Sequence, residues 1–179
     1  METARTHAAR DSIRARERDM IMAEVKPIPE GSHSITPGLV VGDAKKAIEF
    51  YKTALGATVL DVMNGPDGSV MHAELKLGDS KFYLGDENPE WGAVAPQTLG
   101  GSPVSLNVYT EDCDALIQRA VKGGATLEQP PMDMFWGDRY GKIKDPFGHK
   151  WGIATHKEDV SKEEMARRGR EWMAQMSKK

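Results

Sequence analysis

The chain has 179 residues and a formal net charge of −3, and 39% of its residues are hydrophobic and 28% charged. This composition is typical of one soluble globular domain, or of two small modules that share a core. No basic stripe lies outside the N-terminal tail, and no apolar run approaches the roughly 20 residues that cross a bilayer, so we expect neither nucleic-acid binding nor a membrane span. The single cysteine, Cys113, excludes an internal disulfide, which predicts a cytoplasmic protein.

Residues 1–24 are rich in arginine and poor in large apolar side chains. Acidic residues interrupt the arginines, which argues against a transit peptide, and no apolar stretch supports a signal peptide. We therefore expect a disordered or frayed tail without a catalytic role. The folded domain is expected over residues 25–158, and a C-terminal helix within residues 159–179.

A first unit of one strand, one helix and three further strands is predicted over residues 35–86. Asp43 is suited to cap a helix that runs to about Leu55, and Gly56 is suited to end it. The helix has one apolar face, formed by Ala44, Ala47, Ile48, Tyr51 and Leu55. Alternating patterns and turn residues predict strands at residues 35–41, 58–63, 70–77 and 81–84.

The same order of elements returns in residues 103–156, after a polar linker or lid at residues 86–101. At an offset of 68 positions Gly56-Ala57-Thr58 recurs as Gly124-Ala125-Thr126, with further matches at Val40/Val108, Ala47/Ala115 and Ile48/Leu116. Several matches in one register indicate a duplicated βαβββ unit. In the second unit a short strand at residues 126–128 is expected to lead into a long loop.

A hairpin closes the second unit. Its turn, Asp145-Pro146-Phe147-Gly148, has proline to preset φ at the second position and glycine to accept a positive φ at the fourth. Beyond it, Ser161 to Glu164 form a capping box that opens the C-terminal helix. We expect the sparse apolar stripe of this helix to dock on the domain or on a second subunit.

One helix per unit covers one face of a four-stranded sheet and leaves the other face open. Two such units predict an α+β fold in which tandem βαβββ modules form a cupped mixed sheet, with a ligand cavity on its concave face. Strand alternation assigns to the helix-covered face Met71, Ala73 and Leu75, then Val104, Leu106 and Val108, and in the last strand Trp151 and Ile153. It leaves on the open face His72, Glu74, Lys76, Tyr83, Ser105, Asn107, Tyr109, Lys150, Gly152 and Ala154, with Arg139 as a further candidate.

His72 and Glu74 form the most suggestive pair on that face. A neighbouring carboxylate can orient an imidazole or share a metal ion with it. Two ligands at i and i+2 still need a third and a fourth ligand from elsewhere. A solvated polar surface would give the same pattern, so both interpretations stay open.

The order of elements and several short motifs resemble the vicinal-oxygen-chelate superfamily, which contains glyoxalase I, bleomycin resistance proteins and extradiol dioxygenases. The general motifs are Gly42-Asp43-Ala44, Phe50-Tyr51, Leu55-Gly56-Ala57 and Asp145-Pro146-Phe147-Gly148. Finer features are similar to the PhnB-like branch, among them His72-Ala73-Glu74, Gly137-Asp138-Arg139 and Gly148-His149-Lys150-Trp151. The resemblance covers residues 25 to about 173 and implies the glyoxalase/bleomycin resistance fold.

In metal-using members of that superfamily, the two modules supply the metal ligands in pairs. The resemblance puts the ligand positions near Thr36, Tyr83, Pro103 and Gly152, none of which is a histidine or a carboxylate. This departure argues against the usual divalent-metal chemistry. A displaced metal site would have to use His72 and Glu74.

Two functions stay open. The first is a lyase or isomerase of glyoxalase type that polarises a substrate oxygen by a metal ion, or by Arg139 with Asn107. In that case Glu74 or His72 would act as general acid or base.

The second function is a metal-free protein that sequesters a small aromatic or antibiotic-like compound. Its cavity would be walled by aromatic side chains such as Tyr83 and Trp136, with polar residues fixing the orientation of the ligand. For either function we expect a small-molecule ligand and a homodimer, since a small cupped module often completes its cavity with a partner.

Overall fold

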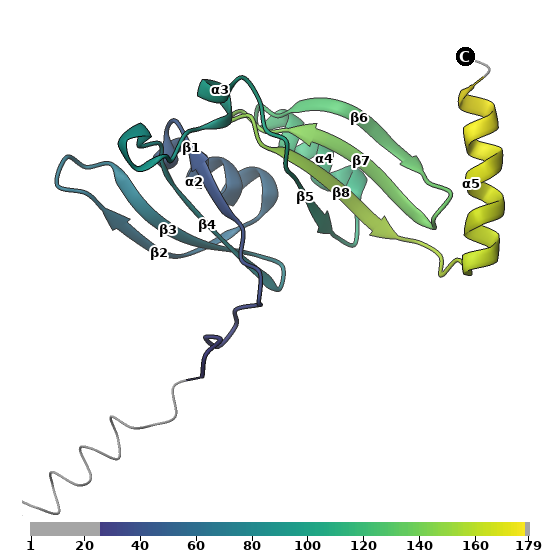
Figure 1. Cartoon of the computed structure of the whole chain (residues 1–179), viewed down its shortest axis with the longest axis horizontal. Coiled ribbons are helices and arrows are strands. Elements are labelled where there is room, and N and C mark those ends of the chain that lie inside the picture. The colour runs from purple at the N-terminus through teal and green to yellow at the C-terminus, as the bar shows by residue number, and fades with distance from the viewer. Residues whose placement is uncertain (1–25, 178–179) are drawn as a thin grey trace, which may run out of the picture. The chain divides into compact units, whose positions relative to one another are not determined.

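The computed structural model describes residues 26–177 of the chain (Figure 1). The predicted N-terminal tail, residues 1–24, lies outside the described residues. The described residues fall into two units, which divide between Ser34 and Ile35. In the described part of the first unit, the Ser32 amide closes a turn by donating to the Pro29 carbonyl at 3.0 Å. All helices and strands named below belong to the second unit.

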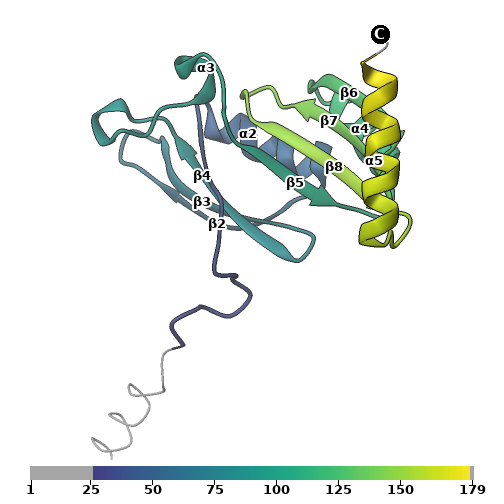
Figure 2. The same ribbon diagram turned by 45° about the vertical axis from the view of Figure 1, so that its right-hand side comes forward.

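The first module of the second unit is a four-stranded mixed sheet with one helix. The strand order is β1-β4-β3-β2, with β1 parallel to β4 and the other neighbours antiparallel. Helix α2 continues into the π-helical segment η1 and covers one face of the sheet (Figure 2). The elements are β1 (Gly38–Val41), α2 (Ala44–Phe50), η1 (Tyr51–Leu55), β2 (Thr58–Asn64), β3 (Val70–Leu77) and β4 (Ser80–Asp86).

The second module repeats this arrangement, in the order β5-β8-β7-β6 with β5 parallel to β8. Its elements are β5 (Ser105–Tyr109), α4 (Cys113–Lys122), β6 (Thr126–Asp133), β7 (Asp138–Lys144) and β8 (Lys150–His156). A linker with the short helices η2 (Pro89–Trp91) and α3 (Pro96–Leu99) joins the modules. The predicted α+β fold of two βαβββ modules is confirmed. Each module keeps its own sheet, so the outer edges of β1 and β5 have no partner strand among the described residues.

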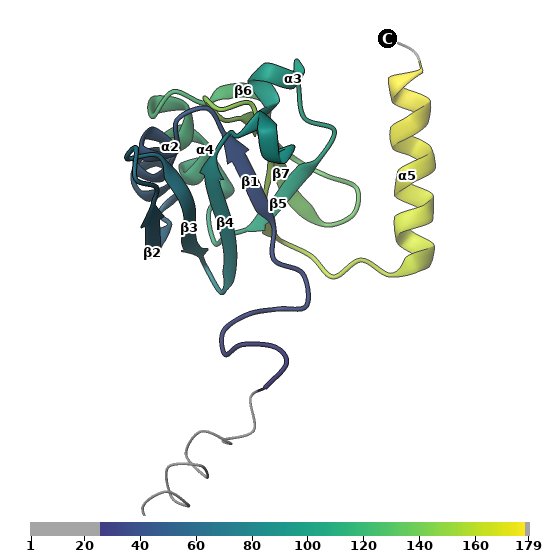
Figure 3. The same ribbon diagram turned by 60° about the vertical axis from the view of Figure 1, so that its left-hand side comes forward.

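Helix α5 (Lys162–Met176) follows β8 and stands to one side of the second sheet (Figure 3). Ser161 caps it by accepting a hydrogen bond from the Glu164 amide at 3.2 Å, as the capping box predicts. None of the residues of this fully described helix is buried. Its contacts with the domain include the Trp172 ring, 5.8 Å from the ring of Phe135, and Arg168, which pairs with Glu158.

The first helix begins and ends where the sequence predicts. The Asp43 carboxylate accepts from the Lys46 amide at 3.0 Å, and Gly56 ends the helix at a φ of 82°, a conformation that favours glycine. All the predicted apolar-face residues are buried. The last turn is π-helical, and Tyr51, its first residue, is fully buried.

Asp145, in the turn of the closing hairpin, is a buried carboxylate with four hydrogen-bond donors. One oxygen accepts the backbone amides of Phe147 and His149, both at 2.9 Å. The other accepts the Tyr51 hydroxyl at 2.7 Å and the Trp151 indole nitrogen at 2.9 Å. Because Tyr51 belongs to the first module, this carboxylate joins the two modules inside the core.

Three strand assignments differ from the structure. Met71 is 48% exposed rather than facing the helix, because a register shift opposite Met63 and Asn64 makes it the extra residue of a bulge. Val104, assigned to the helix-covered face, lies outside β5 and is 62% exposed. Ala154 lies on the open face as assigned, although Tyr109 and Tyr140 beside it bury it.

The third difference concerns β6, which runs to Asp133 instead of stopping at residue 128. Pro130 and Pro131 are tolerated because β6 is an edge strand whose register shifts between Gln129 and Met132. The predicted long loop is therefore mostly strand.

We expect Asp145→Asn to destabilise the fold by roughly 3 kcal/mol, since the amide loses the charge and leaves buried donors without an acceptor. Urea unfolding followed by tryptophan fluorescence measures this loss. The control is Asp79→Asn, in the exposed β3–β4 turn, for which we expect a change within about 0.5 kcal/mol. A loss below about 1 kcal/mol for Asp145→Asn would show that the buried carboxylate does not hold the modules together.

Candidate functional site

The open face of the first sheet carries the predicted His72 and Glu74, both half-buried on β3. The His72 ring lies 4.9 Å from the ring of Tyr83 on β4. These two residues and Trp91 of the linker help to line a hollow of about 750 Å³. The Glu74 carboxylate instead binds the Lys81 ammonium at 2.7 Å. The structure thus brings His72 together with Tyr83 and engages Glu74 with a lysine.

A smaller hollow of about 280 Å³ lies on the open face of the second sheet. Predicted residues Asn107 and Trp136 line it, together with Tyr109, Tyr140 and Lys142. It shares no lining residue with the hollow at His72. The predicted substrate-binding residues Tyr83 and Asn107 therefore belong to different hollows of this chain.

Gly152 lies at the base of this second face, where its lack of a side chain matters. A Cβ at this position would lie 2.2 Å from Asn107 Oδ1 and 2.5 Å from the Tyr140 hydroxyl. The Asn107 and Tyr140 side chains therefore cover the backbone of Gly152 directly. Any side chain at residue 152 would have to displace both of them.

Asp138 is buried at one end of the second hollow and accepts three side-chain hydrogen bonds. The donors are the Tyr109 hydroxyl at 2.9 Å, the Trp136 indole nitrogen at 2.9 Å and His156 Nδ1 at 2.8 Å. His156 Nε2 lies 3.0 Å from Asp159 on its other side. Trp136 is thereby fixed in orientation while one face of it lines the hollow.

These contacts shift the ionisation of the cluster. Burial raises the pKa of Asp138, but its hydrogen bonds with His156, Tyr109 and Trp136 outweigh burial and bring it below the ordinary value. The hydrogen bonds from His156 to Asp138 and Asp159 raise the pKa of the imidazole. Asp138 also raises the pKa of the Tyr109 phenol. The ionised form of Asp138 and the protonated form of His156 are therefore favoured together.

Arg139 lies on the other face of the second sheet. Its guanidinium donates to both carboxylate oxygens of Asp114 on α4, and to Asp133 at 3.2 Å. Asn107 and Trp136 lie on the open face, so the structure does not bring Arg139 together with them. Strict alternation along β7 would have predicted this placement. Asp138, Tyr140 and Lys142 lie on one face of the strand, and Arg139 lies on the other.

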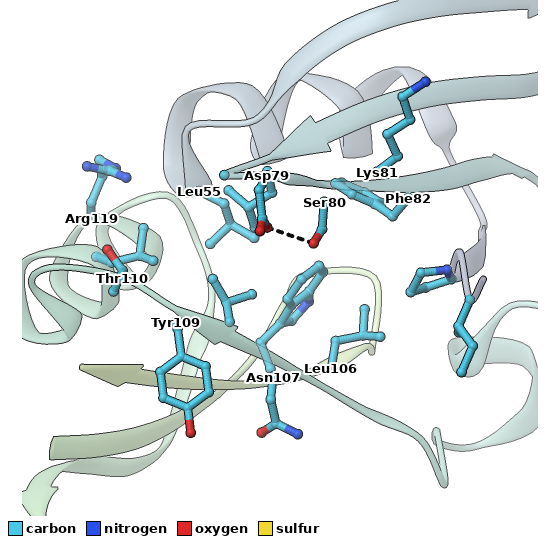
Figure 4. A pocket seen from close by; sticks show the side chains of 17 residues that line it. Leu55, Asp79, Ser80, Lys81, Phe82, Leu106, Asn107, Tyr109, Thr110 and Arg119 are labelled. Carbon is cyan, nitrogen blue, oxygen red and sulfur yellow. Dashed lines mark hydrogen bonds between the residues drawn. The ribbon is translucent and has the colours of Figure 1, made fainter. Parts of the chain in front are cut away.

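A third cavity, of about 700 Å³, lies between β4 and β5 on the helix side. Figure 4 shows Leu55, Phe82 and Leu106 around it, while Lys81 points away. Ser80 donates to Asp79 at 2.9 Å at its edge. Its lining combines core residues such as Leu116 and Trp151 with polar ones, among them Asp79, Arg119 and the predicted Asn107.

The residues at the positions that the motif resemblance assigns to metal ligands do not form a donor set for a divalent metal ion. Proline and glycine at residues 103 and 152 supply no donor side chain. Within residues 26–177 no three His, Cys, Asp or Glu side chains gather as a metal site requires. His72 and Glu74 thus have no third ligand from the described part of the same chain.

Comparison with known proteins gives a consistent set of relatives. A family model described as the Glyoxalase/Bleomycin resistance protein/Dioxygenase superfamily matches residues 32–153. An uncharacterised protein of Mycobacterium bovis is 39% identical over 135 residues, which are 74% of this chain and 89% of that protein.

Two solved structures extend the likeness. One is a gene product from Arabidopsis thaliana, 29% identical with a TM-score of 0.56, covering 68% of this chain and 98% of that one. The other is a PhnB protein from Bacillus cereus, 20% identical with a TM-score of 0.52 over 69% of this chain and 99% of that one, a likeness of fold. No helix in the described part of this chain is long and apolar enough to cross a membrane.

We expect the His156 imidazole to titrate above about pH 6.5, its ordinary value. A histidine whose pKa folding raises stabilises the fold when protonated, so its contribution is complete below about pH 6.5 and is lost as pH rises through the raised pKa. Proton NMR of the ring and urea unfolding between pH 5 and 9 measure both. His156→Gln should flatten this part of the stability profile, whereas His33→Gln, in the first unit, should not. An unchanged profile in His156→Gln would contradict the assigned pairing.

Proposed function

Because the chain belongs to the Glyoxalase/Bleomycin resistance protein/Dioxygenase superfamily, we propose that it binds a small aromatic compound on the open faces of its sheets without using a metal ion. Membership confirms the resemblance that its motifs carry. One observation supports the metal-free binding role above all. At Gly152, a ligand position in metal-using relatives, Asn107 and Tyr140 occupy the space of a side chain.

The chemistry of the second hollow suits an aromatic guest. Trp136, Tyr109 and Tyr140 provide flat apolar surfaces, and aromatic side chains favour edge-to-face or offset contact with a guest ring. Trp136 is held by Asp138, so little side-chain entropy is lost on binding. The Asn107 amide offers a donor and an acceptor to orient a polar substituent.

We expect aromatic compounds to raise the melting temperature, and a chelator to leave both the protein and this shift unchanged. A ligand present at 100 times its Kd adds about 2.7 kcal/mol of stability. Asn107→Ala should weaken binding about tenfold, whereas Gln118→Ala, on the exposed side of α4, should not. Stabilisation by nickel, zinc or manganese together with loss of binding in a chelator would overturn the metal-free role.

A second candidate is a lyase or isomerase of glyoxalase type. The observation that favours it is His72, whose ring lies tilted against the ring of Tyr83 and lines the larger hollow. His72 would serve as general acid or base, with Glu74 as its partner once released from Lys81. Turnover in a glyoxalase assay that His72→Gln abolishes without loss of stability would establish this candidate over the first.

We further propose that the chain forms a homodimer in the cytoplasm, where its single thiol, Cys113, stays reduced. Strands β1 and β5, whose outer edges have no partner strand within residues 26–177, border a cavity of about 470 Å³. Large apolar side chains on its wall are strongly exposed, with Ile35 at 83%, Leu99 at 67% and Val104 at 62%. An apolar strand edge of this kind invites a partner, and a second copy supplies the matching edge.

We expect the protein to sediment as a dimer at micromolar concentration and Val104→Asp to sediment as a monomer. The matched control is Met63→Asp, on the far edge strand β2 at 54% exposure, which should stay dimeric. A monomer in the unaltered protein, or equal dissociation in both variants, would rule out this interface.

A further inference from the structure

Three lysines share the open face of the second sheet: Lys142, Lys144 and Lys150. Lys144 on β7 is the direct cross-strand partner of Lys150 on β8, and Lys142 lies two residues along β7. Ile143 and Trp151, which alternate with them, are buried in the core. All three ammonium groups therefore leave the sheet on the side opposite α4.

This arrangement costs stability unless something neutralises it. Like charges directly opposite each other on neighbouring strands repel. Elsewhere on the domain the charged side chains form many ion pairs, such as Arg139 with Asp114 and Arg168 with Glu158. None of the ion pairs found within residues 26–177 involves any of the three lysines.

The first module shows the same positions in a partly neutralised form, with one of its two lysines in an ion pair. Its buried pair Leu75 and Phe82 corresponds to Ile143 and Trp151, so Lys76 opposite Lys81 corresponds to Lys144 opposite Lys150. In the first module Glu74 lies two residues from Lys76 along β3, and its carboxylate binds the Lys81 ammonium at 2.7 Å. The position equivalent to Glu74 in the second module is Lys142. One acid in the first copy is thus a third base in the second.

Hydrogen-bond donors surround the lysines on this face. The register places Ser105 beside Lys150 and Asn107 beside Gly152, and Lys142 lines the aromatic hollow, its ammonium 5.9 Å from the centre of the Tyr140 ring. Ammonium, hydroxyl and amide donors together match the oxygens of a carboxylate or phosphate. The adjoining hollow of about 280 Å³ has room for one aromatic ring.

We propose that the open face of β5, β8 and β7 binds an anionic aromatic molecule, with its carboxylate or phosphate group at Lys142, Lys144 and Lys150 and its ring against Trp136 and Tyr140. This inference rests on the proposed binding function and names the class of ligand. The lysines attract the anion, which supplies the counter-charge that no acidic residue within residues 26–177 provides, and the hollow accommodates the ring.

Three probes test the proposal: phenyl phosphate, benzoate and the neutral benzyl alcohol, each titrated into the full chain and followed by amide NMR shifts. We expect both anions to bind at least tenfold tighter than benzyl alcohol, with saturable shifts at residues 142–152. Raising salt from about 20 to 200 mM should weaken the anions and leave the alcohol unchanged. Phenyl phosphate binding tighter than benzoate would assign a phosphate group, and the reverse order a carboxylate.

Substitutions of the lysines separate the contribution of their charge to binding from that of the shape of the hollow. Replacing all three lysines with glutamine should weaken the anions about tenfold or more and leave benzyl alcohol unaffected. Lys142→Glu, which rebuilds the arrangement of Glu74 and Lys81, should have a similar effect. The matched control, Lys45→Gln, changes an exposed lysine on α2 and should bind like the unaltered protein.

The outcomes distinguish this inference from the function on which it rests. Equal affinity for benzyl alcohol and the anions, or anion binding that survives the lysine replacements, would overturn the anion site and leave aromatic binding intact. Absence of shifts at this face with every probe would overturn both.

Discussion

A single buried carboxylate holds the two halves of this domain in one core. Asp145 receives two donors from its own turn, one from Trp151 on β8 and one from Tyr51 on the first module's helix. A buried carboxylate is stable only when all of its acceptor sites are used, so the turn, the last strand and the first helix must reach their places together. His149 Nε2, 3.0 Å from the Val40 carbonyl, adds a second polar link between the modules. The open faces of both sheets then take up fixed positions on a common core.

The sequence was sufficient for the order of the strands and of the longer helices and for the duplication, but it did not predict the short linker helices η2 and α3. Caps at Asp43 and Ser161 and the turn at Asp145 are local signals, and alternation placed most strand residues on the correct face. It failed where the chain leaves strict alternation, at the bulge around Met71 and along the proline-bearing edge strand β6. Such departures depend on how the strand pairs with its partner. The sequence pattern of a single strand carries no information about that pairing.

The candidate site was less predictable, because it depends on which side chains meet. His72, Asn107 and Trp136 were recognised as open-face or pocket residues, but no sequence signal joined Trp136, Tyr109 and His156 through Asp138. These residues lie on three different strands and a loop. Likewise the resemblance places a metal ligand at residue 152, where the sequence has glycine, whereas only the structure shows Asn107 and Tyr140 in the space that a side chain would take.

The strand period of two has a consequence for how such a duplicated protein diversifies. Along β3 and β7 alternate residues pack in the core, and the residues between them do not take part in that packing. The buried pairs Leu75 with Phe82 and Ile143 with Trp151 have kept their role in both copies, while the positions beside them hold Glu74 in one and Lys142 in the other. The residues that contact a ligand can therefore change on the open face of the sheet, while selection for folding acts on the residues of the core face. A single chain can in this way present two differently charged surfaces on the same scaffold.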